Sequence, residues 1–77
     1  MNEGIDWASE RARAGSHTQR SLAALAVRAG WTVARGRGKG GHWLAHREGV
    51  PRPVAIPSKL NRSIAFSVVW QLEGGGR

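Results

Sequence analysis

Two stretches of the chain carry apolar residues at the spacing of an amphipathic helix. In residues 16–29 the apolar positions fall on one narrow stripe at 100° per residue. These positions are Leu22, Leu25, Ala26 and Ala29. Ser16 and Gln19 match a capping box at the start of this helix, and Gly30 stands where a glycine ends one. His17 is then expected to be a surface residue at the helix start.

The second helix is predicted over residues 61–73, with Asn61 or Ser63 as its N-cap. Its core face is expected to carry Ile64, Ala65, Val68, Val69 and Leu72. Phe66 and Trp70 stand four residues apart on a different face, so we expect them to form an exposed aromatic pair. Because such a pair often marks a protein interface, Phe66 and Trp70 are a candidate partner-binding surface.

Three short segments between the helices have the alternation and the β-branched residues that are typical of strands. They span residues 31–35, 42–46 and 54–56. In the second strand, alternation puts Trp43 and Ala45 on one face and both histidines with Leu44 on the other. Trp31 and Trp43 could stack on nucleic-acid bases, but in so small a domain we expect them to fill the core or line the sheet.

The predicted order of elements is α-β-β-β-α. This is an α+β fold, in which a three-stranded antiparallel sheet has two helices packed on one face. A chain of 77 residues allows one small domain with a thin margin of stability. We assign this domain to residues 16–77, and we expect residues 1–15 to be an N-terminal extension that is either a short helix or a flexible arm.

Positive charge dominates the chain after its first ten residues. There are 12 Lys and Arg against 5 Asp and Glu, a net charge of +7. Residues 1–10 hold three acids and no base, so they sum to −3 and the remainder to +10. Such a surplus favours a polyanionic partner, and nucleic acid is the first candidate. An arginine-rich surface can also arise from codon usage without any such partner.

Composition also excludes several classes of protein. The chain has no cysteine, which excludes a disulfide scaffold and a thiolate zinc site. No apolar run approaches the roughly 20 residues of a membrane helix, and the N-terminus lacks the basic and then apolar segments of a signal peptide. We therefore expect a cytoplasmic protein that does not contact a membrane.

Two short motifs do not indicate a cofactor or a metal. Gly36, Gly38 and Gly41 match G-x-G-x-x-G, but a strand follows them instead of the helix that a dinucleotide site requires. His42 and His46 would face the same way on a strand, yet two ligands are too few for a metal site. We expect neither a cofactor nor a bound metal.

The most informative stretch is the glycine-rich basic loop that leads into His42. Glycines let a backbone approach a phosphate closely, and Arg35, Arg37 and Lys39 would neutralise its charge. An imidazole has a reference pKa near 6.5, which suits a general base at neutral pH. Because RNA carries its own nucleophile, the 2′-hydroxyl, one base and a few cations could suffice to cleave it. The residues leave open the alternative that His42 only binds RNA or lies at the loop edge.

These residues, in this order, resemble the HicA family of bacterial mRNA interferase toxins. Residues 30–35, which begin with a glycine and a tryptophan, are similar to the end of the family's first helix and its first strand. Gly40, Gly41 and His42 stand where that family has a Gly-Ser-His motif. Residues 54–57 are similar to its Val-x-Val-Pro segment. The resemblance covers residues 18–74, with three departures: Gly41 replaces the serine, the loop before His42 is longer, and Ser58 replaces a residue that is often basic or histidine.

The resemblance implies a fold like that of the double-stranded RNA-binding domain and metal-independent cleavage of mRNA with His42 as the catalytic histidine. It implies that RNA is held by Arg35, Arg37, Lys39, Gly40 and Gly41, with Lys59 and Arg62 as helpers. The implied protein partner is a HicB-like antitoxin. The implied assembly is either a hetero-oligomer of the two proteins or a homodimer of this chain. Because of the missing serine, a non-catalytic RNA-binding module of the same fold remains the alternative. A protein-interaction domain that uses Phe66 and Trp70 is a third hypothesis.

Overall fold

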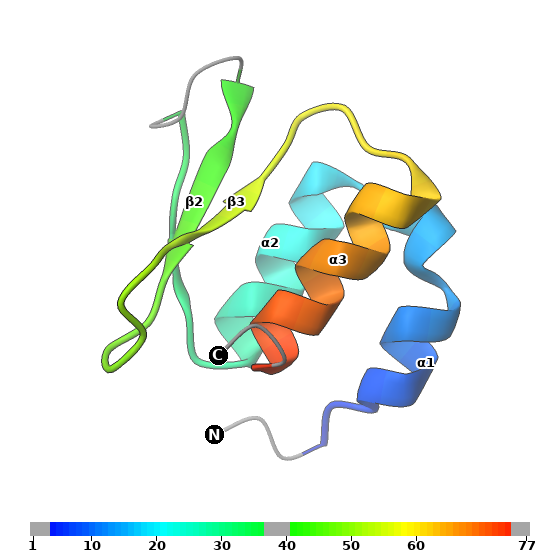
Figure 1. The fold of residues 1–77 in the computed structure, drawn as a ribbon, viewed down its shortest axis with the longest axis horizontal. Coiled ribbons are helices and arrows are strands. Elements are labelled where there is room, and N and C mark those ends of the chain that lie inside the picture. Colours follow the sequence, from blue (N-terminus) through cyan, green and yellow to red (C-terminus); the bar gives the residue numbers. More distant parts are fainter. Residues whose placement is uncertain (1–3, 37–40, 75–77) are drawn as a thin grey trace.

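A computed structural model describes residues 4–36 and 41–74 of the chain. Its central elements follow the predicted α-β-β-β-α order and form the expected α+β fold. A short helix and a 3-10 turn precede them and pack against the last helix (Figure 1). In chain order, the elements are α1 (Trp7–Ala12), η1 (Ala14–Ser16), α2 (Gln19–Arg28), β1 (Thr32–Ala34), β2 (Trp43–His46), β3 (Val54–Ile56) and α3 (Arg62–Glu73).

The sheet is antiparallel with the order β1-β2-β3, and α2 and α3 cover one of its faces (Figure 1). Val33 of β1 pairs with Ala45, which in turn pairs with Val54 of β3. Ala45 is fully buried and Trp43 packs against the core, whereas His46 is exposed. The alternation predicted for this strand is therefore confirmed.

Helix α2 begins later than its sequence pattern predicts, because residues 14–16 form the 3-10 turn η1. Thr18, in extended conformation, is the N-cap, and its capping box is completed by Ser21. The predicted box of Ser16 and Gln19 is therefore wrong. The predicted end of the helix is confirmed: Gly30 has φ +94°, its N–H bonds to the Val27 carbonyl and the next N–H bonds to the Ala26 carbonyl. This arrangement is a Schellman motif.

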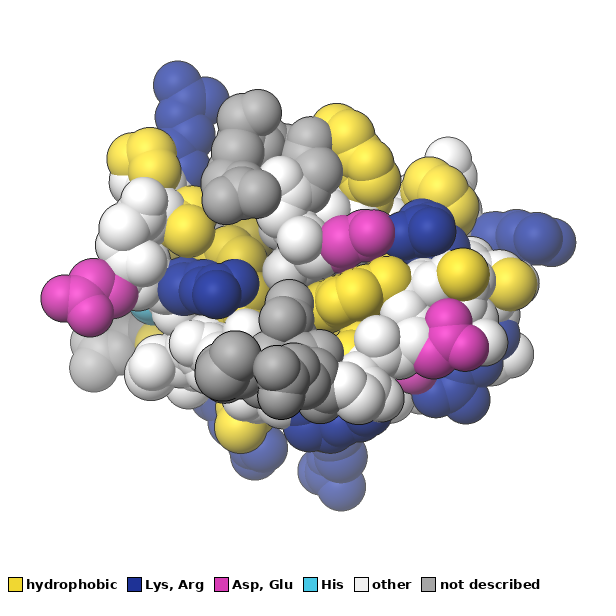
Figure 2. Space-filling model, turned by 90° about the horizontal axis from the view of Figure 1, so that it is seen from below, with side chains coloured by type: hydrophobic (Ala, Val, Ile, Leu, Met, Phe, Trp, Pro, Cys, Tyr) yellow, Lys and Arg dark blue, Asp and Glu magenta, His cyan; other side chains and the backbone are white. Residues whose placement is uncertain are grey.

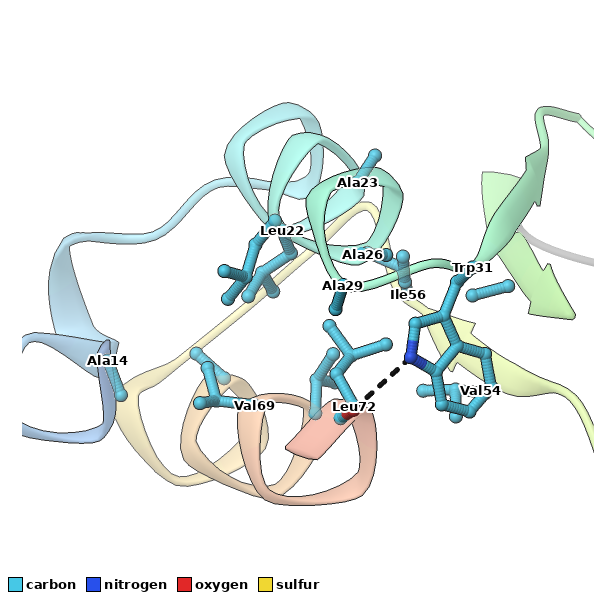
Figure 3. Close-up of a cluster of buried hydrophobic side chains, with 14 residues drawn as sticks. Ala14, Leu22, Ala23, Ala26, Ala29, Trp31, Val54, Ile56, Val69 and Leu72 are labelled. Atoms are coloured by element: carbon cyan, nitrogen blue, oxygen red, sulfur yellow. Dashed lines mark hydrogen bonds between the residues drawn. The ribbon is translucent and has the colours of Figure 1, made fainter. Parts of the chain in front are cut away.

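The core lies between the sheet and the two long helices (Figure 3). It contains the whole predicted stripe of α2, namely Leu22, Leu25, Ala26 and Ala29. It also contains four of the five residues predicted for α3, but Ile64 stays 39% exposed. Ile64 lies in the first turn of α3, where its N–H donates to the side chain of the Asn61 cap. It is not among the described residues that form the buried cluster.

Trp31 packs into the strand side of this core and is 5% exposed. Its Nε1–H donates to the carbonyl oxygen of Leu72 at 3.2 Å (Figure 3). That carbonyl belongs to the last turn of α3, where no intrahelical N–H is available. The bond therefore ties the strand side of the core to the end of α3.

The N-terminal extension is a docked helix over part of its length. Helix α1 packs on α3, and an ion pair joins Arg11 to Glu73. Ala14 of η1 is fully buried in the core.

The prediction that His17 lies on the surface is wrong, because its side chain is only 5% exposed. Its Nε2 lies 2.9 Å from the buried Glu10 carboxylate, and its Nδ1 lies 2.8 Å from Ser21 Oγ. Arg13 adds a second pairing with Glu10. These contacts join α1 to the start of α2.

Candidate functional site

The start of β2, the end of β3 and the first turn of α2 meet at one end of the molecule (Figure 1). We call this place the junction and define it by Gln19, Gly41, His42, Ile56 and Ser58. When the register of β2 and β3 is continued past its last pair, Trp43 with Ile56, Gly41 falls opposite Ser58. A Cβ atom on Gly41 would lie 3.4 Å from Ser58 Oγ. Two of the three departures from the HicA pattern, Gly41 and Ser58, therefore face each other.

Gly41 has φ +82°, which is left-handed backbone that side chains other than glycine rarely adopt. The backbone thus turns sharply immediately before His42. A serine in this conformation would be strained, so the glycine follows from the local backbone and not only from a lost side chain. Ser58 brings a hydroxyl to the same place from the opposite segment.

Gln19 holds the junction together. Its Nε2 donates to the Gly41 carbonyl oxygen at 2.8 Å and to the Ile56 carbonyl oxygen at 2.9 Å. The sequence pattern assigned Gln19 to a helix cap and missed this role. Its partners stand 22 and 37 residues away along the chain, so no local pattern could have indicated them.

His42 follows this anchored backbone, with its side chain partly buried. Within the described part of the chain, its Nδ1 is shielded from solvent and has no hydrogen-bond partner. A buried polar atom without a partner is rare in folded proteins and calls for an explanation such as a catalytic role or a missing ligand. The ring therefore turns Nδ1 away from solvent.

Arg35 lies across from the start of β2. Its guanidinium carbon is 4.7 Å from the centroid of the Trp43 ring, which is the geometry of a cation–π contact. Such a contact restrains a side chain that would otherwise sample many rotamers, while its N–H donors stay available to a phosphate. Trp43 thus supports a cation that the sequence indicates for RNA binding.

The other predicted RNA contacts are three residues outside the described part of the chain, Lys59 near the junction, and Arg62 away from it. Arg37, Lys39 and Gly40 lie outside the described residues. Lys59 is exposed and directly follows Ser58 of the junction.

Arg62 lies elsewhere. Its stem runs within 3.8 Å of the position that a Cβ on Gly15 would occupy, and it lines an open hollow with Ser63 and Phe66. The structure thus places Arg62 beside η1 and the outer face of α3 instead of beside His42.

Among the described residues, Lys and Arg side chains also lie away from the junction (Figure 2). The end that carries the chain termini, opposite the junction, presents Lys and Arg side chains with acidic ones interspersed among them (Figure 2). Arg11 and Arg13 are paired with carboxylates, and the Arg47 guanidinium lies 6.0 Å from the Trp31 ring centroid. Charge alone therefore does not locate a binding site, and the junction stands out by its geometry.

The predicted aromatic pair is exposed, as expected. Phe66 is 45% and Trp70 46% exposed, and both lie on the outer face of α3. Ile64, 39% exposed, adds a third large apolar side chain to the same helix.

Within the residues that the structure describes, no three His, Asp or Glu side chains come together as they would to hold a metal ion. None of the described helices has the length and apolar character needed to cross a membrane. Comparisons with known protein families, with characterised proteins and with solved structures find no match to this chain.

Proposed function

We propose that this chain is an endoribonuclease, the toxin of a toxin–antitoxin pair, and that His42 is its general base. The observation that carries the proposal is the placement of His42. Its backbone is turned by Gly41 and anchored by Gln19, and its Nδ1 is buried without a hydrogen-bond partner among the described residues. The resemblance to HicA-type toxins points to the same histidine and supports the same reaction.

In the proposed reaction, Nε2 of His42 takes the proton of an RNA 2′-hydroxyl. The 2′-oxygen attacks the adjacent phosphorus, and the bond from phosphorus to the 5′-oxygen of the next nucleotide breaks. The leaving oxygen takes a proton from solvent or from the imidazolium. The products are a 2′,3′-cyclic phosphate and a free 5′-hydroxyl. Arg35, held on Trp43, would stabilise the charge that develops on the phosphate oxygens.

The proposed chemistry is expected to be slow. For Nε2 to accept a proton, the neutral ring must carry its own proton on Nδ1. Catalytic histidines usually fix this tautomer by donating Nδ1–H to a carbonyl or carboxylate, and Nδ1 of His42 has no such acceptor among the described residues. A positioned base contributes about 10²–10⁴-fold to the rate, and the lower end of that range is expected here.

The same observation, together with Gly41 in place of serine, favours a second candidate, a non-catalytic RNA-binding module. Domains of this fold recognise the shape and the 2′-hydroxyls of A-form RNA. This candidate predicts binding that weakens steeply with salt and gives no cleavage products.

The test compares the wild-type protein with His42→Ala and His46→Ala on 5′-labelled RNA. His46 is the matched control, because it ends the strand that His42 precedes and its side chain is exposed. We expect the wild type and His46→Ala to produce cyclic-phosphate ends and His42→Ala to lose about 10²-fold or more. A 2′-deoxy substitution at the cleaved position should abolish cleavage there. Equal cleavage by His42→Ala and the wild type would overturn the role of His42.

RNA binding without cleavage by the wild type would instead favour the second candidate. Expression in bacteria provides a parallel test, since growth arrest and mRNA loss should depend on His42 and not on His46.

We further propose that the exposed face of α3 formed by Phe66 and Trp70 binds the antitoxin. An antitoxin of the HicB type that contacts this face would be expected to carry acidic groups toward Arg62, which borders Phe66. Substitution of Trp70 by Ala should weaken that complex without changing cleavage by the isolated chain.

A further inference from the structure

We propose that Gln19 is a positioning residue for His42, acting through the peptide bond that joins Gly41 to His42. The proposal goes beyond the role of His42 and rests on the proposed ribonuclease function only for its effect on cleavage. Its structural part, that Gln19 sets the orientation of His42, can be tested without RNA.

The first argument is the rigidity of the element that carries Gln19. It is the first residue of α2, directly after the Thr18 cap. The helix is anchored three and four residues later by Leu22, fully buried, and Ala23, 4% exposed. An amide on this turn is therefore fixed relative to the core.

The second argument is the weakness of the segment that Gln19 holds. Gly41 belongs to the residue type with the largest backbone freedom, and the chain turns there through left-handed φ. On the facing segment, Pro57 follows Ile56 and has no N–H to continue the ladder. In the continued register Pro57 stands opposite His42, so it cannot donate to the His42 carbonyl. The peptide bond before His42 is held from α2 by the hydrogen bond from Gln19 to the Gly41 carbonyl.

The third argument is that one amide group holds both segments. Nε2 has two hydrogens, and its two acceptors are the carbonyl oxygens of Gly41 and Ile56. The Gly41 carbonyl belongs to the peptide bond before His42, and the Ile56 carbonyl belongs to the peptide bond before Pro57, which Ser58 follows. Loss of the donor would remove one hydrogen bond from each carbonyl at once and loosen the Gly41–His42 peptide plane.

The test uses Gln19→Glu, which keeps the length and shape of the side chain but cannot donate when ionised. A carboxylate in the first turn also favours the helix, so α2 should remain folded. Gln19→Met, with nearly the same helix propensity and no donor, is the second variant in case the carboxylate disturbs the junction. Gln71→Glu is the matched control, because Gln71 Nε2 donates only to Ser67 Oγ on the exposed side of α3.

Two measurements are made on each protein. The first is NMR of the His42 backbone amide and imidazole in the protein alone. We expect both signals to shift or broaden in Gln19→Glu and Gln19→Met and to stay in place in Gln71→Glu, while the melting temperature is preserved. The second is RNA cleavage, where kcat should fall about 10- to 10²-fold and KM should change little.

Unchanged His42 signals in both Gln19 variants would overturn the proposal. A change in the signals together with unchanged kcat would also overturn it, because His42 would then not need its anchored position. If the wild type cleaves no RNA, the ribonuclease proposal fails, and the NMR comparison still decides whether Gln19 positions His42.

Discussion

Replacement of Trp31 by phenylalanine tests whether the indole of Trp31 joins the sheet side of the core to α3. The side chain is 5% exposed, and its Nε1–H is the donor to the buried Leu72 carbonyl. Phenylalanine has two fewer ring carbons, a loss of about 1.5 kcal/mol of burial at about 0.8 kcal/mol each. The carbonyl left without a donor adds about 1–3 kcal/mol. The expected loss is about 2.5–4.5 kcal/mol.

This loss is large for so small a protein. At about 0.05–0.15 kcal/mol per residue, the whole free energy of unfolding would be about 4–12 kcal/mol. Urea unfolding followed by far-UV circular dichroism measures the change, since tryptophan fluorescence would itself be altered by the substitution. With an m-value of about 1 kcal/mol per molar urea, the midpoint should fall by about 2.5–4.5 M, or Trp31→Phe should already be unfolded without urea.

Trp70→Phe is the control for this experiment. Trp70 is 46% exposed, and surface substitutions usually change stability by less than about 0.5 kcal/mol. The reasoning is refuted if Trp31→Phe and Trp70→Phe have the same midpoint, because the buried indole and its hydrogen bond would then contribute nothing beyond an exposed ring.

Two further predictions concern local backbone and charge. The Ser9 N–H and hydroxyl donate to the Asp6 carboxylate at the start of α1 and hold the pKa of Asp6 below its ordinary value, so this cap should stabilise the fold fully above pH of about 4 and lose its effect as pH falls through the lowered pKa. Urea unfolding should therefore separate Asp6→Ala from the wild type at pH 7 and not at pH 2, and an equal difference at both values would contradict the assignment. Gly41→Ala and Gly49→Ala, both at positive φ, should each lose about 1–2 kcal/mol of stability, but only Gly41→Ala should change RNA cleavage. Wild-type stability of Gly41→Ala would show that its backbone does not need glycine.

The sequence by itself determined the order of elements and most of the core. Apolar spacing selected the buried face of α2, and alternation selected the buried face of β2, because both follow from local backbone periodicity. The end of α2 was equally local, since Gly30 takes a left-handed conformation that other residues avoid. The same applies to the exposed pair of Phe66 and Trp70, which lies off the apolar stripe of α3.

The candidate site was only partly visible in the sequence. His42 could be singled out because a histidine after a basic glycine-rich loop has obvious chemistry. The support that Trp43 gives to Arg35 is a cross-strand contact and follows only from the register. The family resemblance groups Arg62 with the other RNA-binding cations, whereas the fold places it against η1.

Only the tertiary structure decided what holds His42 and what covers the N-terminal segment. Gln19 reaches the carbonyls of Gly41 and Ile56 from 22 and 37 residues away, and His17 is buried against Glu10 of α1. Contacts of this kind depend on how finished elements pack, whereas sequence periodicity reports only which face of an element is apolar. The sequence could therefore identify the imidazole and the faces of the helices, and packing alone determined the orientation of the imidazole.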